Sequence, residues 1–317
     1  MTVVLFHMAA TSSLRRQLEE LAASIEPSLR IAWCDEDDDA RLGQLLPEAE
    51  VIWHLLRPLG AKEFDAAPKL RLVQKLGSGV NTIDLEEAGR RGIAVSNMPG
   101  TNAPAVAEAT VGLMLSALRW LPTLDAATRA GRGWPTDPSL FERAAELAGA
   151  TVGLVGHGAI AQRVHRVLDA FDARVLYTTE TPRPTEPGWR PLDELLVESD
   201  IVSLHVPATP ATNNLLDDRR LALLRPGAVI VNTARGSLVD DAALIAALRR
   251  GQVAAAALDV FTTEPLPVDH PLLALPNVVV TPHIAWVTAA TMRRCVQVAA
   301  ENCVRLASGA PLHHQVV

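Results

Sequence analysis

Three side chains able to bind an anion or move a proton follow three apolar segments in the second half of the chain. Arg235 lies in VNTARGS, Glu264 in ALDVFTTEP and His283 in VVVTPHIAW. Short apolar segments of this kind are typical of buried parallel strands, whose carboxyl ends form the ligand-binding edge of an open α/β sheet. The spacing therefore predicts that an arginine, a glutamate and a histidine meet at one sheet edge.

These three groups suit the interconversion of a 2-oxo acid and a 2-hydroxy acid. The guanidinium can hold a carboxylate through two hydrogen bonds and polarise the neighbouring carbonyl. His283 can donate a proton to the carbonyl oxygen as a hydride arrives, and can accept it in the reverse reaction. Glu264 would favour the imidazolium and hold the ring's orientation. Taken alone, Arg235 would fit a surface ion pair, Glu264 a turn and His283 a loop. The prediction therefore depends on all three following consecutive strands.

A glycine-rich turn predicts that a dinucleotide supplies the hydride. GLVGHGAIA places Gly156, Gly158 and Ala161 in the pattern GxGxxA between an apolar strand and a helix. The first glycine permits a tight turn, the second lets the backbone approach a pyrophosphate, and the small third residue lets helix and strand touch. The N–H groups at Ala159 and Ile160 would then hold the phosphates. A tight turn without a ligand is the alternative interpretation.

The residues after the next strand bear on the choice between NAD and NADP. Thr179 stands where an NAD enzyme usually has an acid, and Glu180 follows it. A carboxylate there accepts hydrogen bonds from ribose hydroxyls and repels a 2′-phosphate, whereas Arg183 would attract that phosphate. The sequence favours NAD, with NADP as the alternative.

The elements that must position these residues alternate between strands and helices in two series. The predicted fold class is α/β with two Rossmann-like doubly wound domains, the first discontinuous, and an active-site cleft between them. We expect residues 1–97 and 286–317 to form a substrate-binding domain and residues 98–285 to form the nucleotide-binding domain. The first helix should be capped by Ser12 or Ser13, and a last helix, 291–307, should pack on the first domain.

Two segments between these elements have distinctive compositions. The stretch 119–147 contains Trp134, Pro135 and Pro138, and we expect an irregular excursion that could contact another subunit. The acidic stretch 34–40 lacks the central Gly and the final Glu of a calcium-binding loop, so we expect a solvated loop.

Composition argues against several other classes of function. A net charge of -7 and an aromatic content of 4% disfavour nucleic acid as a partner. The N-terminus lacks the pattern of a signal peptide, and no apolar run approaches the ~20 residues of a spanning helix. Three widely spaced cysteines indicate a reducing cytoplasm. No HExxH or similar spacing is present, so we predict no metal.

Seven motifs, taken together, resemble the D-isomer-specific 2-hydroxyacid dehydrogenases, a family that includes glyoxylate/hydroxypyruvate reductases and D-3-phosphoglycerate dehydrogenases. They are KLGSGVNTIDL, NMPGTNAPAVAEATVGLML, GLVGHGAIAQRV, SLHVPATPATNNLL, NTARGSLVD, ALDVFTTEP and TPHIA. The resemblance implies that Arg235 binds the substrate carboxylate and that His283 is the acid/base with Glu264 as its partner. It also implies a small 2-oxo acid such as glyoxylate or hydroxypyruvate as substrate, and a homodimer formed through the nucleotide domain.

The same resemblance assigns further residues to the two ligands. Asp259 would hold the nicotinamide carboxamide. The other positions expected to line the cofactor are Thr110, His205, Val206, Pro207, Thr212, Thr233 and Ala234. Those expected near the substrate are Leu76, Gly77, Ser78, Gly79 and Trp286. Thr179 and Trp286 depart from the usual pattern of the family, and an NAD(H)-sensing protein of the corepressor type is the alternative function.

Overall fold

The computed structural model describes residues 1–26, 28–134 and 138–317, which form two compact units. Unit 1 contains Met1–Asn102 and Thr288–Val317, and unit 2 contains Ala103–Val287. The sequence predicts boundaries after residues 97 and 285. The units divide instead just before helix α5 (Ala103–Leu118) and before Thr288, the N-cap of helix α12 (Ala289–Ser308).

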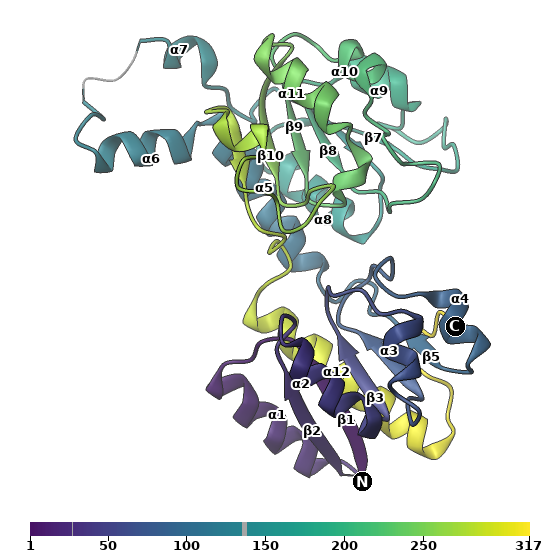
Figure 1. Cartoon of the computed structure of the whole chain (residues 1–317). Helices are drawn as coiled ribbons and strands as arrows, with labels where there is room; N and C mark the ends of the chain where they lie inside the picture. The colour runs from purple at the N-terminus through teal and green to yellow at the C-terminus, as the bar shows by residue number, and fades with distance from the viewer. Residues whose placement is uncertain (27, 135–137) are drawn as a thin grey trace. The chain divides into compact units, whose positions relative to one another are not determined.

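Unit 1 is built on a five-stranded parallel sheet with the order β2-β1-β3-β4-β5 (Figure 1). Its strands are β1 (Thr2–His7), β2 (Leu29–Cys34), β3 (Val51–His54), β4 (Leu72–Lys75) and β5 (Ala94–Ser96). Its other helices are α1 (Ser12–Ser24), α2 (Asp39–Leu45), α3 (Ala61–Asp65) and α4 (Leu85–Arg90), with a 3-10 turn at Leu46–Glu48. Helix α12 packs on this sheet, where the amide of Asn302 donates to Gln74 of β4 at 2.6 Å.

Two local expectations for unit 1 are wrong. The N-cap of α1 is Thr11, whose hydroxyl accepts from the N–H of Leu14 at 3.2 Å, and Ser12 already lies inside the helix. The acidic stretch is also more than a solvated loop. Asp38 caps α2, and Glu36 accepts hydrogen bonds from the N–H groups of Leu56 and Arg57. These carboxylates satisfy backbone donors that would otherwise have no partner.

Unit 2 is built on a six-stranded parallel sheet with the order β11-β10-β9-β8-β6-β7. Its strands are β6 (Thr151–Val155), β7 (Arg174–Thr178), β8 (Ile201–Leu204), β9 (Ala228–Asn232), β10 (Val253–Leu258) and β11 (Val278–Val280). Besides α5, its helices are α6 (Leu121–Arg129), α7 (Leu140–Arg143), α8 (Ala159–Asp169), α9 (Leu192–Glu198), α10 (Asp218–Leu223) and α11 (Asp241–Arg249), with 3-10 turns at Gly236–Leu238 and Pro271–Ala274. The strand order reverses between β6 and β8, which is where an open sheet of this kind binds its ligand.

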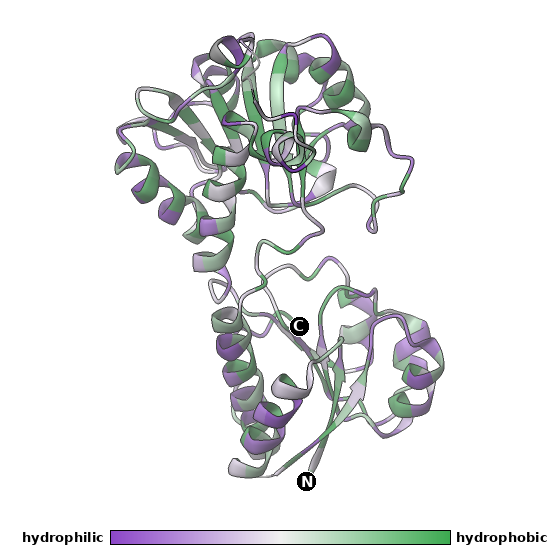
Figure 2. Ribbon diagram, turned by 90° about the vertical axis from the view of Figure 1, so that its left-hand side faces the viewer, coloured by the Kyte–Doolittle hydropathy of each residue, from purple (hydrophilic) through white to green (hydrophobic). Residues whose placement is uncertain are grey.

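Helices cover both faces of this second sheet because its strands are apolar on both sides. All five residues of β6 are buried, and the strands are coloured mainly as hydrophobic in Figure 2. On one face, α8 buries Ala161, Val164 and Leu168, a helical spacing that forms one apolar stripe. Helix α5 packs on the same face and is buried around much of its circumference, as its sequence predicts.

The segment 119–147 is an excursion, as we expected from its composition, but it is not irregular throughout. It contains helices α6 and α7, which extend away from the body of unit 2 in Figure 1. None of the α6 residues, all of which the structure describes, is buried. Pro135 lies outside the described residues. The segment is therefore partly helical, and most residues of α6 are exposed.

Candidate active site

The turn after β6 has the geometry that the GxGxxA pattern predicts. Gly156 has a φ of 99°, and a Cβ at this position would lie 2.5 Å from the carbonyl oxygen of His205. Only glycine can therefore bring the ends of β6 and β8 this close together. Ala161 is fully buried between α8 and the sheet, so a larger side chain would push the helix away.

Helix α8 presents its N-terminus at this turn. Gly158 is the N-cap and has no side chain to cap the helix, so the first N–H groups, at Ala159 and Ile160, are left for an external acceptor. A Cβ at Gly158 would meet nothing within 4 Å, which shows that space lies open in front of the backbone. Free N–H groups, a helix dipole and open space fit the pyrophosphate of a dinucleotide.

The end of β7 is held by contacts that the sequence does not predict. The ring of Tyr177 stacks on His157 of the glycine turn at a centroid distance of 3.9 Å. The hydroxyl of Thr179 donates to the carbonyl of Thr181 at 2.7 Å and accepts from the indole N–H of Trp189 at 3.1 Å. Both hydrogen bonds fix the backbone at the predicted ribose position, so Thr179 has a structural role there.

Two charged residues near Thr179 differ in their surroundings. Glu180 is exposed and, among the described residues, makes no hydrogen bond or ion pair. Arg183 lies 3.4 Å from one carboxylate oxygen of Glu186, and the other oxygen of Glu186 accepts from the hydroxyl of Tyr177 at 2.6 Å. Glu180, which would accept hydrogen bonds from a ribose, is therefore accessible, whereas Arg183, which would bind a 2′-phosphate, lies beside a carboxylate.

The loop after β8 is braced by its own side chains. The ring of His205 lies 2.9 Å from the hydroxyl of Ser203, and burial, with a smaller contribution from His157, lowers the pKa of His205 to about 4. The hydroxyl of Thr212 donates to the carbonyl of Pro207 at 2.7 Å, closing the loop that also contains the half-buried Val206. His205 is therefore a neutral group in the physiological pH range.

Thr110 and Thr233 join helix α5 to the end of β9. Their hydroxyl oxygens are 2.8 Å apart, and Thr110 also donates to the carbonyl of Val106 at 2.7 Å. Because the proton of Thr110 is used in that second bond, Thr233 is the donor between them. Both side chains are buried, so this pair lies beneath the carboxyl edge of the sheet.

Arg235 extends the edge beyond β9. Asn232 organises this turn, since its side chain accepts from the N–H of Ala234 at 3.0 Å and donates to the carbonyl of Arg235 at 2.8 Å. The guanidinium donates to the carbonyl of Ala234 at 2.6 Å. Burial lowers the pKa of Arg235, and the nearby charge of Glu264 opposes that shift. Arg235 and Glu264 are thus electrostatic neighbours.

Glu264 and His283 form a direct pair. A carboxylate oxygen of Glu264 lies 2.7 Å from Nδ1 of His283, and its other oxygen accepts from the N–H of Phe261 at 2.9 Å. Burial alone would raise the pKa of Glu264. The hydrogen bonds from His283 and Phe261, and the charges of His283 and Arg235, lower it overall. Glu264 is therefore ionised at neutral pH and able to stabilise a protonated imidazole.

Gly236 allows these three residues to come together, and sequence reasoning missed it. A Cβ at Gly236 would lie 1.9 Å from the carbonyl carbon of Phe261 and 2.3 Å from the nitrogen of Thr262. The turn after β9 and the loop after β10 can pack this closely only because Gly236 has no side chain. The signal was present in the sequence, as a glycine directly after the arginine in NTARGS.

The predicted substrate loop belongs to unit 1, directly after β4. The carbonyl oxygens of Gly77 and Ser78 accept from the N–H of Met98 and the amide of Asn97, each at 2.8 Å. Within the described chain, the N–H groups of Gly77, Ser78 and Gly79 donate no hydrogen bond. With its carbonyls held in this way, the loop has backbone donors left for an anion. Leu76 is buried beneath it, and Trp286, at the end of unit 2, is half-buried.

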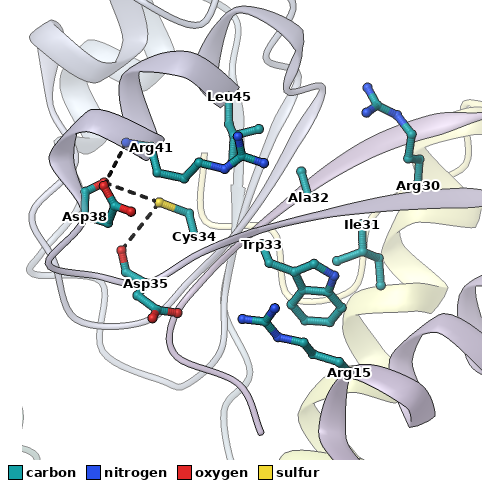
Figure 3. Close-up of a pocket in the computed structure, with 10 residues that line it drawn as sticks. All are labelled: Arg15, Arg30, Ile31, Ala32, Trp33, Cys34, Asp35, Asp38, Arg41 and Leu45. Carbon is teal, nitrogen blue, oxygen red and sulfur yellow. Dashed lines mark hydrogen bonds between the residues drawn. The ribbon is translucent and has the colours of Figure 1, made fainter. Parts of the chain in front are cut away.

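A separate hollow of about 460 Å³ lies along the edge strand β2 of unit 1 (Figure 3). All of its lining residues come from the range 15–45, and Arg15 lies over the ring of Trp33. The hollow is therefore distinct from the predicted catalytic and cofactor-binding residues.

In the part of the chain that the structure describes, no group of three or more His, Cys, Asp or Glu side chains could hold a metal ion. None of the helices found there has the length and apolar composition that crossing a membrane requires.

Comparison with known proteins agrees with this arrangement. Residues 111–285 match the NAD-binding domain of the D-isomer specific 2-hydroxyacid dehydrogenases. A glyoxylate reductase of Thermofilum pendens is 42% identical over 260 residues, covering 79% of this chain and 76% of the relative.

Two solved structures show the same fold. A D-lactate dehydrogenase of Aquifex aeolicus, complexed with NAD and lactic acid, superposes with a TM-score of 0.82 at 30% identity, covering 96% of each chain. An NADPH-dependent glyoxylate/hydroxypyruvate reductase of Sinorhizobium meliloti, in complex with NADP and malonate, gives a TM-score of 0.84 at 30% identity, covering 100% of this chain and 97% of that one. The chain therefore belongs to the D-isomer specific 2-hydroxyacid dehydrogenase family.

Proposed function

We propose that this protein reduces a small 2-oxo acid to the D-2-hydroxy acid and catalyses the reverse oxidation. The observation that carries the proposal is the contact of 2.7 Å between Nδ1 of His283 and a carboxylate oxygen of Glu264. The charge of Arg235 also helps to lower the pKa of that carboxylate. All three residues lie in the same unit as the glycine turn. Glyoxylate and hydroxypyruvate are the first acids to test, because relatives carry those names.

A bound nicotinamide cofactor supplies or accepts the hydride in this chemistry. Arg235 binds the substrate carboxylate through charge-assisted hydrogen bonds and polarises the adjacent carbonyl. His283 donates a proton to the carbonyl oxygen, and Glu264 keeps the ring charged and oriented until it does so. The backbone of Leu76, Gly77, Ser78 and Gly79 adds donors for the substrate, and Trp286 adds an apolar surface near it.

The residues proposed to hold the cofactor divide by what each part of it needs. Gly156, Gly158, Ala159 and Ile160 bind the pyrophosphate, and Thr179 and Glu180 face the ribose. The remaining lining positions are Thr110, His205, Val206, Pro207, Thr212, Thr233, Ala234 and Asp259.

A panel assay tests the proposed function. The purified protein is mixed with NADH or NADPH and a series of 2-oxo acids, and the loss of nicotinamide absorbance and the chirality of the product are measured. We expect steady turnover of at least one small 2-oxo acid with a D-hydroxy acid as the product. Tight cofactor binding without turnover of any acid would favour an NAD(H)-sensing protein instead.

We infer a preference for NAD over NADP, since Glu180 is exposed and unpaired among the described residues while Arg183 faces Glu186. Glu180→Ala should raise the ratio of kcat/KM with NADPH to that with NADH by roughly tenfold, or ~1.4 kcal/mol, because a repelled 2′-phosphate is then tolerated. The matched control is Glu146→Ala, an exposed glutamate beside the residues that precede β6 and β8, which should leave the ratio unchanged. An unchanged ratio in Glu180→Ala would remove that contact from the proposal.

We also propose a homodimer formed through unit 2. The supporting observation is helix α6, whose apolar Leu121 is 50% exposed, with Trp134 beyond it 83% exposed. Light scattering should give a mass of twice the 33.9 kDa chain, and Leu121→Glu with Trp134→Ser should shift the protein to the monomer. Val197→Glu, on the exposed side of α9, should leave the dimer intact. A dimer that survives the double substitution would place the interface elsewhere.

We place the protein in the cytoplasm on the state of its thiols. Cys34, Cys295 and Cys303 are all free and buried, and burial raises the pKa of Cys303 to about 12. Thiols in this state fit a reducing compartment.

A further inference from the structure

Three arginines line the hollow on the outer edge of unit 1. Arg15 comes from α1, Arg30 from β2 and Arg41 from α2. None of the three forms a salt bridge with a described residue, and Arg41 donates only to the side-chain oxygen of Gln44, at 3.3 Å. Nearby Arg57, by contrast, is paired with an aspartate. Guanidiniums without acidic partners leave charge and donors for an external anion.

Arg15 is held in place without having its charge neutralised. Its guanidinium lies over the ring of Trp33, 5.2 Å from the centroid, and this contact fixes the side chain beside the strand. Its Nε is buried and has no hydrogen-bond partner among the described residues. Figure 3 shows Arg15 on one side of β2 and Arg41 on the other. The two guanidiniums therefore flank the edge of the sheet.

The edge strand adds backbone donors between these side chains. Strand β2 pairs with β1 alone, and just before it the N–H of Thr2 donates to the carbonyl of Ser28 at 3.1 Å. Successive residues of a strand direct their backbone groups to opposite sides, so the even-numbered residues of β2 face β1. The N–H groups of Ile31 and Trp33 therefore face outward, where no described strand pairs with them.

The acidic residues of the lining do not neutralise the hollow. The carboxylate of Asp38 caps α2, where it accepts from the N–H of Arg41 at 2.9 Å. Asp35 follows the last residue of β2, Cys34. Burial, followed by the charges of Asp38 and Asp35, raises the pKa of the Cys34 thiol, so the thiol adds no negative charge at neutral pH. Three guanidiniums against two carboxylates leave the lining positive in a chain whose net charge is -7.

We propose that this hollow binds a small polyanion, a molecule that carries two or more carboxylate or phosphate groups. Its volume of about 460 Å³ falls within the roughly 300–1,000 Å³ of small-molecule sites. One anionic group binds Arg15, and another binds Arg41 and Arg30. The N–H groups of Ile31 and Trp33 lie between them. None of the lining residues belongs to the proposed catalytic or cofactor-binding set.

Calorimetric titration with citrate tests the proposal, at low ionic strength because screening is then weakest. The protein is saturated with NADH and carries Arg235→Ala, so that the sites proposed for the cofactor and the substrate carboxylate do not compete. We expect one citrate per chain. The Kd should rise about fivefold in Arg15→Ala or in Arg41→Ala, and roughly twentyfold when both are replaced, because each loses one charge contact.

Two controls separate the hollow from charge in general. Arg16→Ala removes an exposed arginine of α1 that does not line the hollow, so it should leave the Kd for citrate unchanged. Acetate, with a single charge, should bind about tenfold more weakly than citrate, since it cannot contact arginines on both sides of the strand. An unchanged Kd for NADH in Arg15→Ala and Arg41→Ala shows that both variants fold.

The outcomes decide the proposal without reference to turnover. A Kd for citrate that the double substitution leaves unchanged would place the anion elsewhere and overturn it. Acetate that binds as tightly as citrate would overturn the requirement for more than one charge. Inorganic phosphate that binds in place of citrate, and is lost in the double variant, would support the site and assign phosphate groups to its ligand. If neither probe binds, the arginines serve only to keep the edge strand from pairing with another chain.

Discussion

His283→Ala should lower kcat/KM for 2-oxo acid reduction by roughly 10²–10⁴-fold, the usual contribution of a general acid. The expectation follows from the 2.7 Å contact between Nδ1 of His283 and a carboxylate oxygen of Glu264, which orients the ring as the proton donor. Binding of NADH should change little, because the groups proposed to hold its phosphates lie on the turn after β6. Steady-state kinetics, with cofactor binding measured by fluorescence, checks both parts.

Glu264→Gln is the companion variant that separates charge from geometry. The amide keeps the size and one acceptor oxygen of Glu264 but loses the negative charge that favours an imidazolium. We expect a smaller loss than in His283→Ala, because the ring keeps a hydrogen-bond partner and loses only the negative charge beside it. Kinetics of His283→Ala that match those of the unmodified protein would rule out His283 as the acid.

The direction of the pKa shift at Glu264 also fixes the pH range in which this pair stabilises the folded protein. Its pKa in the folded protein lies below the ordinary value, because the hydrogen bonds and the charges of His283 and Arg235 outweigh burial. A depressed pKa means that the stabilisation is present above the unfolded value and is lost as the pH falls through the folded value. The Glu264 carboxylate therefore contributes its stabilisation at neutral pH and loses it as the pH falls through its lowered pKa.

Much of the fold could be predicted because buried strands and helices require apolar residues at regular spacings in the sequence. The apolar runs that became β6 and β9 are buried at every position, and Gly156 and Ala161 mark the turn and the helix that follow. Parallel strands need apolar residues on both faces, so their sequences stand out from the helices between them. The position of Arg235 at a strand end follows from the same pattern.

The contacts that the sequence did not reveal join segments far apart in the chain. Glu36 accepts from Leu56, and Asp259 accepts from Ala285, in each case across more than fifteen residues. Such bonds depend on how loops approach one another after the sheet has formed, and periodicity carries no trace of that approach. Helix α6 was missed for a different reason, because the prolines and glycines around it dominate the composition of its segment.

Arg235→Ala should give the second large effect, a loss in kcat/KM for 2-oxo acids of about 30- to 5,000-fold. The range corresponds to the ~2–5 kcal/mol that truncating one partner of a buried charge pair costs. The guanidinium is largely buried at the end of β9, where the weaker screening by water strengthens its attraction for a carboxylate. Arg235→Lys keeps the charge without the planar pair of donors, so it should recover only part of the loss.

A neutral substrate distinguishes carboxylate binding from a general loss of activity. The ester of the same 2-oxo acid has the reacting carbonyl and no charge for Arg235 to hold, so in Arg235→Ala its slow reduction should lose only the polarisation of that carbonyl and fall far less than reduction of the acid. The preference for acid over ester should therefore collapse in the variant, because only the acid has lost charge-assisted hydrogen bonds to its carboxylate. If acid and ester lose activity by the same factor, Arg235 supports the folded site and does not bind the carboxylate.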